Sequence, residues 1–232
     1  MSAVLATRTR PVSPLRQARA LFLTELRAEA RAGEVLLVIA PFGAVALLLT
    51  PMALGTDRPL LAQLGAGMYW LIVLLFGVLV TQRQSAADSA EQLAVLRLLG
   101  VPAAARLLAR AVANTTVLAA FELLLLPVLI VLYQPRLPGA GWLIAVVPLV
   151  AAGLGVLGTV AAAVAAGLAG RGTLAPLLVC PVAIPVLLAA TQTFQATGYG
   201  RSPAPWLLLL TTVDLAVWLA AALTAALLEE LA

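Results

Sequence analysis

The chain is a succession of long apolar runs separated by short polar segments. Six such runs follow one another from residue 35 onward, and each is about 20 or more residues long. A helix needs roughly 20 apolar residues to cross the hydrocarbon core of a bilayer. We therefore predict an all-α membrane protein with six transmembrane helices, within residues 35–54, 60–81, 111–133, 137–170, 172–200 and 205–228.

The first 34 residues are more polar and contain six arginines. Ser13 and Pro14 are typical of a helix N-cap and of the first helical position. From there to Ala32 apolar residues recur at helical spacing, which indicates an amphipathic helix suited to the membrane surface. A helix that only leads into the first span fits equally well. We divide the chain into a cytoplasmic N-terminal segment, 1–34, and a transmembrane domain, 35–232. We expect no cleaved signal peptide, because the first segment lacks an apolar core.

The segment between the second and third spans, 82–110, predicts two short cytoplasmic helices. Residues 89–92 read Ser-Ala-Glu-Gln, which fits a capping box, and Gly100 can end the helix that follows. The leucines of this first helix recur along one side: Leu93, Leu96 and Leu99. Pro102 then interrupts the chain before a second helix, 103–110, that leads into the third span. Exposed leucines need a partner surface, which is either the bilayer interface or a groove on a cytoplasmic protein.

Composition and charge agree with a membrane protein. Hydrophobic residues make up 63% of the chain and charged residues 10%, whereas a soluble domain has roughly 25% charged residues. All fourteen basic residues are arginine. With six spans, eleven arginines fall on the side of the termini and three on the other. The positive-inside rule then places both termini in the cytoplasm of a bacterial plasma membrane. Because the arginines flank apolar runs, we expect a lipid bilayer as the partner and no nucleic acid.

The residue types that are missing exclude several chemistries. Without lysine the chain has no phosphate-binding loop of the Walker type, so any ATP must be bound and hydrolysed on another chain. Without histidine it has no imidazole ligand for zinc or haem iron and no catalytic Ser-His or Cys-His pair. The chain is therefore not expected to be an enzyme, to hold a metal, or to bind a cofactor of its own.

Two acidic residues fall inside predicted spans, Glu122 in the third and Asp214 in the sixth. An ionisable group at this depth is costly unless it is paired or hydrated, so a functional role is the default hypothesis. Either acid could line a substrate path or accept hydrogen bonds from the hydroxyls of nearby threonines, such as Thr115, Thr116 or Thr212. The alternative is that each acid is neutral and simply packed.

Residues 153–158 match the dinucleotide-binding fingerprint, with glycine at 153, 155 and 158. That fingerprint requires a preceding strand and a soluble βαβ unit. Here it lies inside an apolar run, where small residues allow two membrane helices to approach closely. We therefore interpret the three glycines as helix-packing positions.

One motif of the chain resembles a known family. The run from Gly167 through Arg171 and Gly172, continued by Pro181 and Pro185, is similar to the loop and fifth span of the CcmB family. This family is the permease subunit of the cytochrome c maturation ABC transporter, also called haem exporter protein B. Glu91 and the two residues after it, followed by Pro102, resemble the family's coupling segment. The resemblance covers most of the chain from about residue 21 to 188.

The resemblance implies an ABC-2-type permease that works with a separate ATP-binding subunit (CcmA-like) and with CcmC-like and CcmD-like membrane subunits. A second copy of the permease could complete a dimer. Haem would be the cargo, or would leave on a chaperone, and ATP would be used by the partner. In this interpretation the ATPase motion is received by five residues: Glu91, Leu93, Leu96, Arg97 and Pro102. An ABC-2-type exporter of a drug, lipid or polysaccharide, and a scaffold that transports nothing, remain the alternatives.

Overall fold

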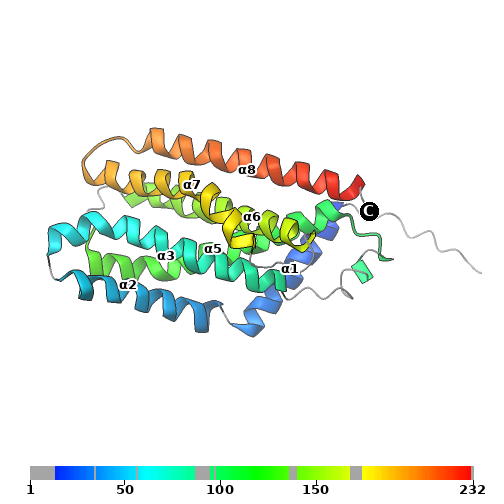
Figure 1. The fold of residues 1–232 in the computed structure, drawn as a ribbon, viewed down its shortest axis with the longest axis horizontal. Coiled ribbons are helices and arrows are strands. Elements are labelled where there is room, and N and C mark those ends of the chain that lie inside the picture. Colours follow the sequence, from blue (N-terminus) through cyan, green and yellow to red (C-terminus); the bar gives the residue numbers. More distant parts are fainter. Residues whose placement is uncertain are drawn as a thin grey trace, which may run out of the picture.

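The computed structural model describes residues 14–33, 35–55, 57–86, 95–96, 98–135, 140–167 and 174–230, and within these ranges the regular structure is entirely helical. The helices lie lengthwise in one bundle, with α1 set obliquely at one end (Figure 1). The elements in chain order are α1 (Pro14–Ala32), η1 (Val35–Ile39), α2 (Ala40–Leu54), α3 (Arg58–Ala86), α5 (Ala103–Tyr133), η2 (Ala140–Trp142), α6 (Leu143–Gly167), α7 (Leu174–Gly198) and α8 (Ala204–Glu230).

Five of these helices are long and apolar enough to cross a membrane. Their apolar parts are Arg58–Arg83, Ala103–Tyr133, Leu143–Ala165, Val179–Gly198 and Ala204–Ala226. They correspond to the second through sixth predicted spans. The first predicted span contains a shorter apolar helix, Leu37–Ala53. At 1.5 Å per residue this segment is about 25 Å long, against about 30 Å for the hydrocarbon core. The structure therefore supports five of the six spans by length.

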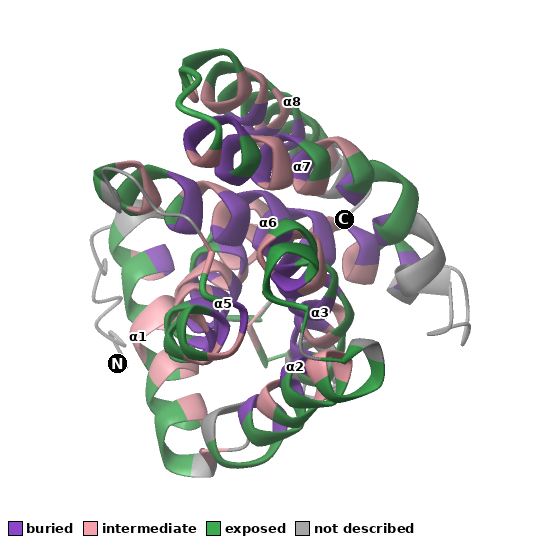
Figure 2. Ribbon diagram, turned by 90° about the vertical axis from the view of Figure 1, so that its left-hand side faces the viewer, coloured by how far each residue is buried: buried purple, intermediate pink, exposed green. Residues whose placement is uncertain are grey.

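Helix α6 is the centre of the bundle. Of the residues in its most apolar stretch, 67% are buried, whereas the figure for the same stretch of α8 is 22%. Viewed along the bundle, α6 lies between α7 and α8 on one side and α3 and α5 on the other (Figure 2). Each of its three motif glycines faces a different helix. A side chain at Gly153 would meet Asp214 of α8, one at Gly155 would meet Thr115 of α5, and one at Gly158 would meet Thr81 of α3.

The packing interpretation of the glycine motif is thus confirmed, and it extends to three neighbours instead of one. Because successive helical residues are turned by about 100°, positions 153, 155 and 158 point in three directions. A glycine at each position lets that neighbour approach closely. The close approach of α5 also places Asn114 beside Thr159 of α6, and the Asn114 amide donates a hydrogen bond of 2.7 Å to the Thr159 hydroxyl.

Helix α5 is the longest element and reaches well beyond the third predicted span. The helix predicted at 103–110 and that span form one continuous helix of 31 residues, about 46 Å long. The amphipathic helix expected up to Ala32 is present as α1, and it packs against α5. Only one side of α1 is therefore left to face its surroundings, and its arginines Arg16, Arg19, Arg27 and Arg31 are exposed there.

Candidate functional site

A helix terminus precedes α5 at the end of the bundle that carries α1. Gly100 has a φ of 68°, a left-handed conformation that glycine adopts without steric cost. The Val101 amide donates a hydrogen bond of 3.1 Å to the carbonyl of Leu96, five residues earlier. This is the long bond of a Schellman motif. The predicted helix end at Gly100 is therefore confirmed, and Pro102 occupies the N-cap position of α5 immediately afterwards.

The apolar surface beside this terminus includes one leucine that the sequence pattern singled out, Leu99, and one that it did not, Leu98. Leu98 is 88% exposed and Leu99 is 69% exposed. Leu96, predicted as a contact residue, is half-buried within the chain itself. Leu98 escaped the sequence analysis because the spacing rule selected one helix side without showing which side the rest of the chain covers. Three predicted coupling residues lie outside the described residues: Glu91, Leu93 and Arg97.

An ion pair joins α1 to the start of α5. The Arg110 guanidinium donates to the Glu25 carboxylate at 3.4 Å, and both side chains are partly buried, at 18% and 30% exposure. Ala18 of α1 is buried, and Leu26 packs against the main core. The N-terminal helix is thus attached to α5 by both charge and apolar contact, close to the terminus at Pro102.

Glu122 lies fully buried in the middle of α5. The hydroxyl of Tyr69, on α3, donates a 2.7 Å hydrogen bond to the backbone carbonyl of Glu122, not to its carboxyl group. Neither carboxyl oxygen has a hydrogen-bond partner among the described residues. The threonine contact considered from the sequence is not formed, since the Thr116 hydroxyl donates to the Val112 carbonyl instead.

Asp214 is also buried, on α8, with 4% of its surface exposed. One of its carboxyl oxygens lies against Gly153 of α6, and both oxygens lack a partner among the described residues. The nearby Thr212 hydroxyl donates to the carbonyl of Leu209. Asp214 and Glu122 therefore come from different helices, and each places an unpaired polar group inside an apolar contact.

The motif that carries the family resemblance is only partly described. Gly167 is the last residue of α6, and Arg171 and Gly172 lie outside the described residues. Pro181 and Pro185 both lie inside α7. Each removes one backbone N–H donor from the helix, which leaves a carbonyl one turn earlier without its usual partner.

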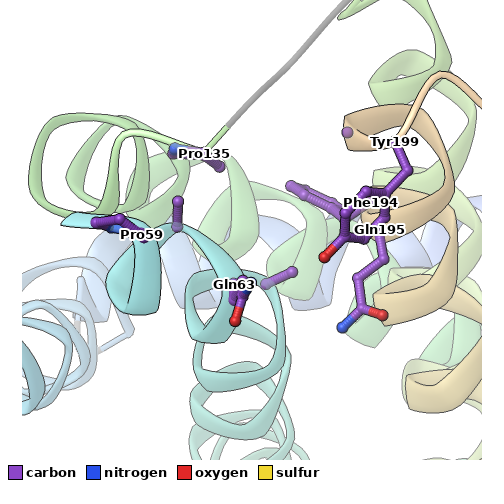
Figure 3. Close-up of a pocket in the computed structure, with 9 residues that line it drawn as sticks. Pro59, Gln63, Pro135, Phe194, Gln195 and Tyr199 are labelled. Atoms are coloured by element: carbon purple, nitrogen blue, oxygen red, sulfur yellow. The ribbon is translucent and has the colours of Figure 1, made fainter. Parts of the chain in front are cut away.

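Two cavities open at the end of the bundle opposite α1, a feature the sequence analysis did not identify. The first, of about 260 Å³, lies between the start of α3 and the end of α7 (Figure 3). It is lined by Pro59, Ala62, Gln63, Ala66, Pro135, Phe194, Gln195, Gly198 and Tyr199. The second, of about 550 Å³, lies between the ends of α2 and α5 and the start of α3, and shares Pro59 and Ala62 with the first. Each lining comes from three separate helix ends, so no local pattern could have predicted it.

Comparison with known proteins agrees with this architecture. The profile of the family described as CcmB protein matches residues 16–229. A protein of Paracoccus denitrificans (strain Pd 1222) named "Heme exporter protein B" is 29% identical over 199 residues, which cover 85% of this chain and 91% of that protein. The family match extends from within α1 almost to the end of α8, and so includes the helix terminus at Gly100, both buried acids and the two cavities. The chain is a member of the CcmB protein family.

Proposed function

We propose that this chain is the membrane permease subunit of an ABC transporter for cytochrome c maturation, and that it acts in the delivery of haem or in the release of a haem-loaded chaperone. The family match over residues 16–229 is the observation that carries the proposal. The relative named "Heme exporter protein B" supports haem as the cargo. The permease itself hydrolyses no ATP, because the chain lacks the lysine of a phosphate-binding loop.

The proposed topology has six spans with both termini in the cytoplasm. The π-helical turn at Val35–Ile39 continues directly into α2, so helical structure covers 20 residues there. Six helices then run back and forth along the bundle, which returns the end of α8 to the end occupied by α1 (Figure 1). A chain that crosses the membrane an even number of times begins and ends on the same side, which agrees with α1 and the end of α8 lying at one end of the bundle. The arginine count of eleven against three assigns that end to the cytoplasm of the bacterial inner membrane.

Residues 91–102 are the proposed contact with an ATP-binding subunit. Glu91 and Arg97 would supply polar contacts and Leu93 and Leu96 apolar ones, and the exposed Leu98 and Leu99 enlarge that apolar surface. The Schellman terminus at Gly100 and the fixed φ of Pro102 join this segment stiffly to α5.

Helix α5 would carry the motion into the membrane. From Ala103 to Leu126 the helix contains no proline and moves as one body, because its backbone hydrogen bonds resist bending; Pro127 then removes one of these bonds. The Glu25–Arg110 ion pair would make α1 move with it. Displacement of α5 would then change the contacts of Glu122 and of the α5–α6 crossing at Gly155. Asp214, on α8, would respond through α6. Polar groups without partners in one arrangement are suited to contacts that form in another.

The partners in this proposal are an ATP-binding subunit of the CcmA type and membrane subunits of the CcmC and CcmD types, together with a second permease copy if the transporter is dimeric. Residues 1–34 would be the cytoplasmic segment and 35–232 the permease domain. The lipid-facing surface agrees with a membrane location, since large apolar side chains such as Leu208, Leu215 and Leu223 of α8 are more than half exposed.

A haem stain after denaturing electrophoresis tests the function. Covalently attached c-type haem survives denaturation, whereas b-type haem is lost, so spectra of b-type haem in the same membranes serve as the control. We expect a deletion strain to lose the c-type bands, to keep the b-type spectra, and to recover the c-type bands with the gene. Unchanged c-type bands would refute the haem assignment and would favour an exporter of another cargo.

A further inference from the structure

One side of α1 carries four arginines and no acidic residue. At about 100° per residue these arginines fall within an arc of about 120° around the helix, and all four are exposed: Arg16, Arg19, Arg27 and Arg31. We call this side of α1 the arginine face. The two acidic residues of α1, Glu25 and Glu29, are partly buried and lie toward the opposite side. None of the four arginines forms an ion pair with another residue that the structure describes.

The arginine face consists of two pairs. Arg16 and Arg19 are three positions apart and Arg27 and Arg31 are four apart, so the members of each pair are neighbours on the helix surface. Like charges at these spacings repel each other and weaken the helix unless an anion lies between them. The two pairs are about 12 Å apart along the helix axis. Guanidinium groups bind phosphate oxygens through paired N–H donors, so each pair can bind a separate phosphate.

The arginine face lies where the polar and the apolar parts of the bundle meet. Helix α1 is attached to α5 at Arg110, the last charged residue before the uncharged stretch 111–121 of that helix. It crosses this end of the bundle obliquely and leads into α2 (Figure 1). A few residues after α1, the side chains of Leu37 and Phe42 are 77% and 63% exposed, as expected for positions that face lipid. Arginines beside such a surface extend their charged ends toward lipid phosphates.

We propose that α1 binds anionic phospholipids through the arginine face, with one headgroup phosphate at each arginine pair. A phospholipid suits both parts of this surface, because its phosphate reaches the arginines while its acyl chains cover Leu37 and Phe42. An acidic soluble protein would match the charges alone. Anionic lipids are favoured over zwitterionic ones, because the positive group of a zwitterionic headgroup offsets its phosphate.

Bound lipid fixes the depth of α1 in the membrane. Because the Glu25–Arg110 ion pair joins α1 to α5, it fixes the start of α5 as well. Lipid binding at the arginine face does not depend on the cargo of the transporter.

The test measures which lipid collects beside α1. The full-length protein carries one fluorophore on a cysteine introduced by Thr24→Cys, since Thr24 is exposed and lies beside the arginine face. The exposed Cys180 is removed by Cys180→Ser, so that the label has a single position. The protein is placed in phosphatidylcholine vesicles that contain a small fraction of nitroxide-labelled phosphatidylglycerol or nitroxide-labelled phosphatidylcholine, with the quencher at the same position of an acyl chain. The ratio of quenching by the two probes gives the enrichment of anionic lipid at α1.

Three double variants change the net charge equally. Two of them each remove one pair from the arginine face: Arg16→Gln with Arg19→Gln, and Arg27→Gln with Arg31→Gln. The matched control, Arg58→Gln with Arg201→Gln, removes two exposed charges at the opposite end of the bundle. Because all the replaced side chains are exposed, each variant should keep the Tm of the wild type.

We expect phosphatidylglycerol to be enriched about fivefold or more over phosphatidylcholine beside wild-type α1. Fivefold corresponds to about 1 kcal/mol, the contribution of one basic residue near an anionic surface. Each arginine-face variant should lower this enrichment by about half or more, whereas the control should keep it. In 1 M salt, where the screening length is about 3 Å, the two probes should quench almost equally.

Three results would overturn the proposal: equal quenching by the two lipids in the wild type, an enrichment that neither arginine-face variant lowers, and an enrichment that the control lowers as much. If the arginine-face variants kept the enrichment but lost c-type bands in the haem stain, the face would belong to an acidic protein partner. Intact c-type bands in the deletion strain would refute the proposed function and leave lipid binding standing.

Discussion

Replacing Gly155 by alanine should destabilise the bundle more than the same change at Gly153. A Cβ atom at position 155 would lie 2.7 Å from the backbone nitrogen of Thr115 and 3.0 Å from its Cα. Backbone atoms cannot rotate away, so α5 and α6 would have to separate. At Gly153 the obstacle is the carboxyl group of Asp214, the end of a side chain that can rotate. At Gly158 the obstacle is Thr81, whose Cβ would lie 2.7 Å away and cannot rotate, so this position is also closed to a larger residue.

The matched control is Gly67→Ala on α3, where an added Cβ has no neighbour within 4 Å. Both substitutions gain the helix propensity of alanine over glycine, about 1 kcal/mol, so this contribution cancels in the comparison. What remains is overpacking, which costs about 1–3 kcal/mol in a close-packed interior. For a chain of this length each kcal/mol shifts Tm by about 2–4 °C. Gly155→Ala should therefore unfold about 2–12 °C below Gly67→Ala.

The assay is thermal unfolding of the purified proteins in one detergent, followed by circular dichroism and by the monodisperse fraction on size exclusion. Wild type, Gly67→Ala, Gly158→Ala and Gly155→Ala are compared at equal protein concentration, so that self-association affects all four equally. Gly67→Ala is expected to be the most stable of the three variants, with Gly155→Ala and Gly158→Ala both below it. If Gly155→Ala were as stable as Gly67→Ala, the close α5–α6 crossing would be wrong.

Three further predictions concern the end of the bundle that carries α1 and the core. Leu98→Asp with Leu99→Asp should leave Tm unchanged, because both side chains are exposed, but should abolish c-type bands in the haem stain; full complementation would contradict the coupling role. Glu25→Ala should lower the free energy of unfolding by no more than about 1 kcal/mol, as expected for a partly exposed pair. The double variant Glu25→Arg with Arg110→Glu exchanges the two charges and should restore any cytochrome c maturation that Glu25→Ala loses. If it does not, the result would argue against α1 moving with α5. Tyr69→Phe removes the 2.7 Å bond to an α5 carbonyl and should cost about 1 kcal/mol, seen as a Tm lower by about 2–4 °C; an unchanged Tm would mean that the bond contributes nothing.

Local signals predicted the features that depend on neighbouring residues. The length of an apolar run decides whether a helix can cross a bilayer, and five long helices lie where the runs predicted them. Helix ends are also local, because they depend on capping residues and on glycine. α1 begins at Pro14, and the helix before α5 ends at Gly100. The absence of lysine and histidine excluded whole classes of chemistry without any structure.

Local reasoning was less successful where two environments look alike in composition. The first span stays a prediction, because the apolar segment of α2 is 17 residues and shorter than the other five, although its sequence resembles theirs. The buried acids could be recognised as unusual, but their neighbours could not be named. The structure places Glu122 near Tyr69 and Asp214 against Gly153, and neither contact has a signal in sequence spacing.

The membrane class, the long helices and the helix end at Gly100 were thus determined by the sequence itself, through run length, residue type and capping. Tertiary structure alone decided that α6 is the centre, that α1 lies on α5, that Leu98 is exposed, and that two cavities open opposite α1. The physical reason is that lipid and protein interior are both apolar. A transmembrane helix therefore has little difference in polarity between its buried and lipid-facing sides, and only side-chain fit decides which neighbours meet.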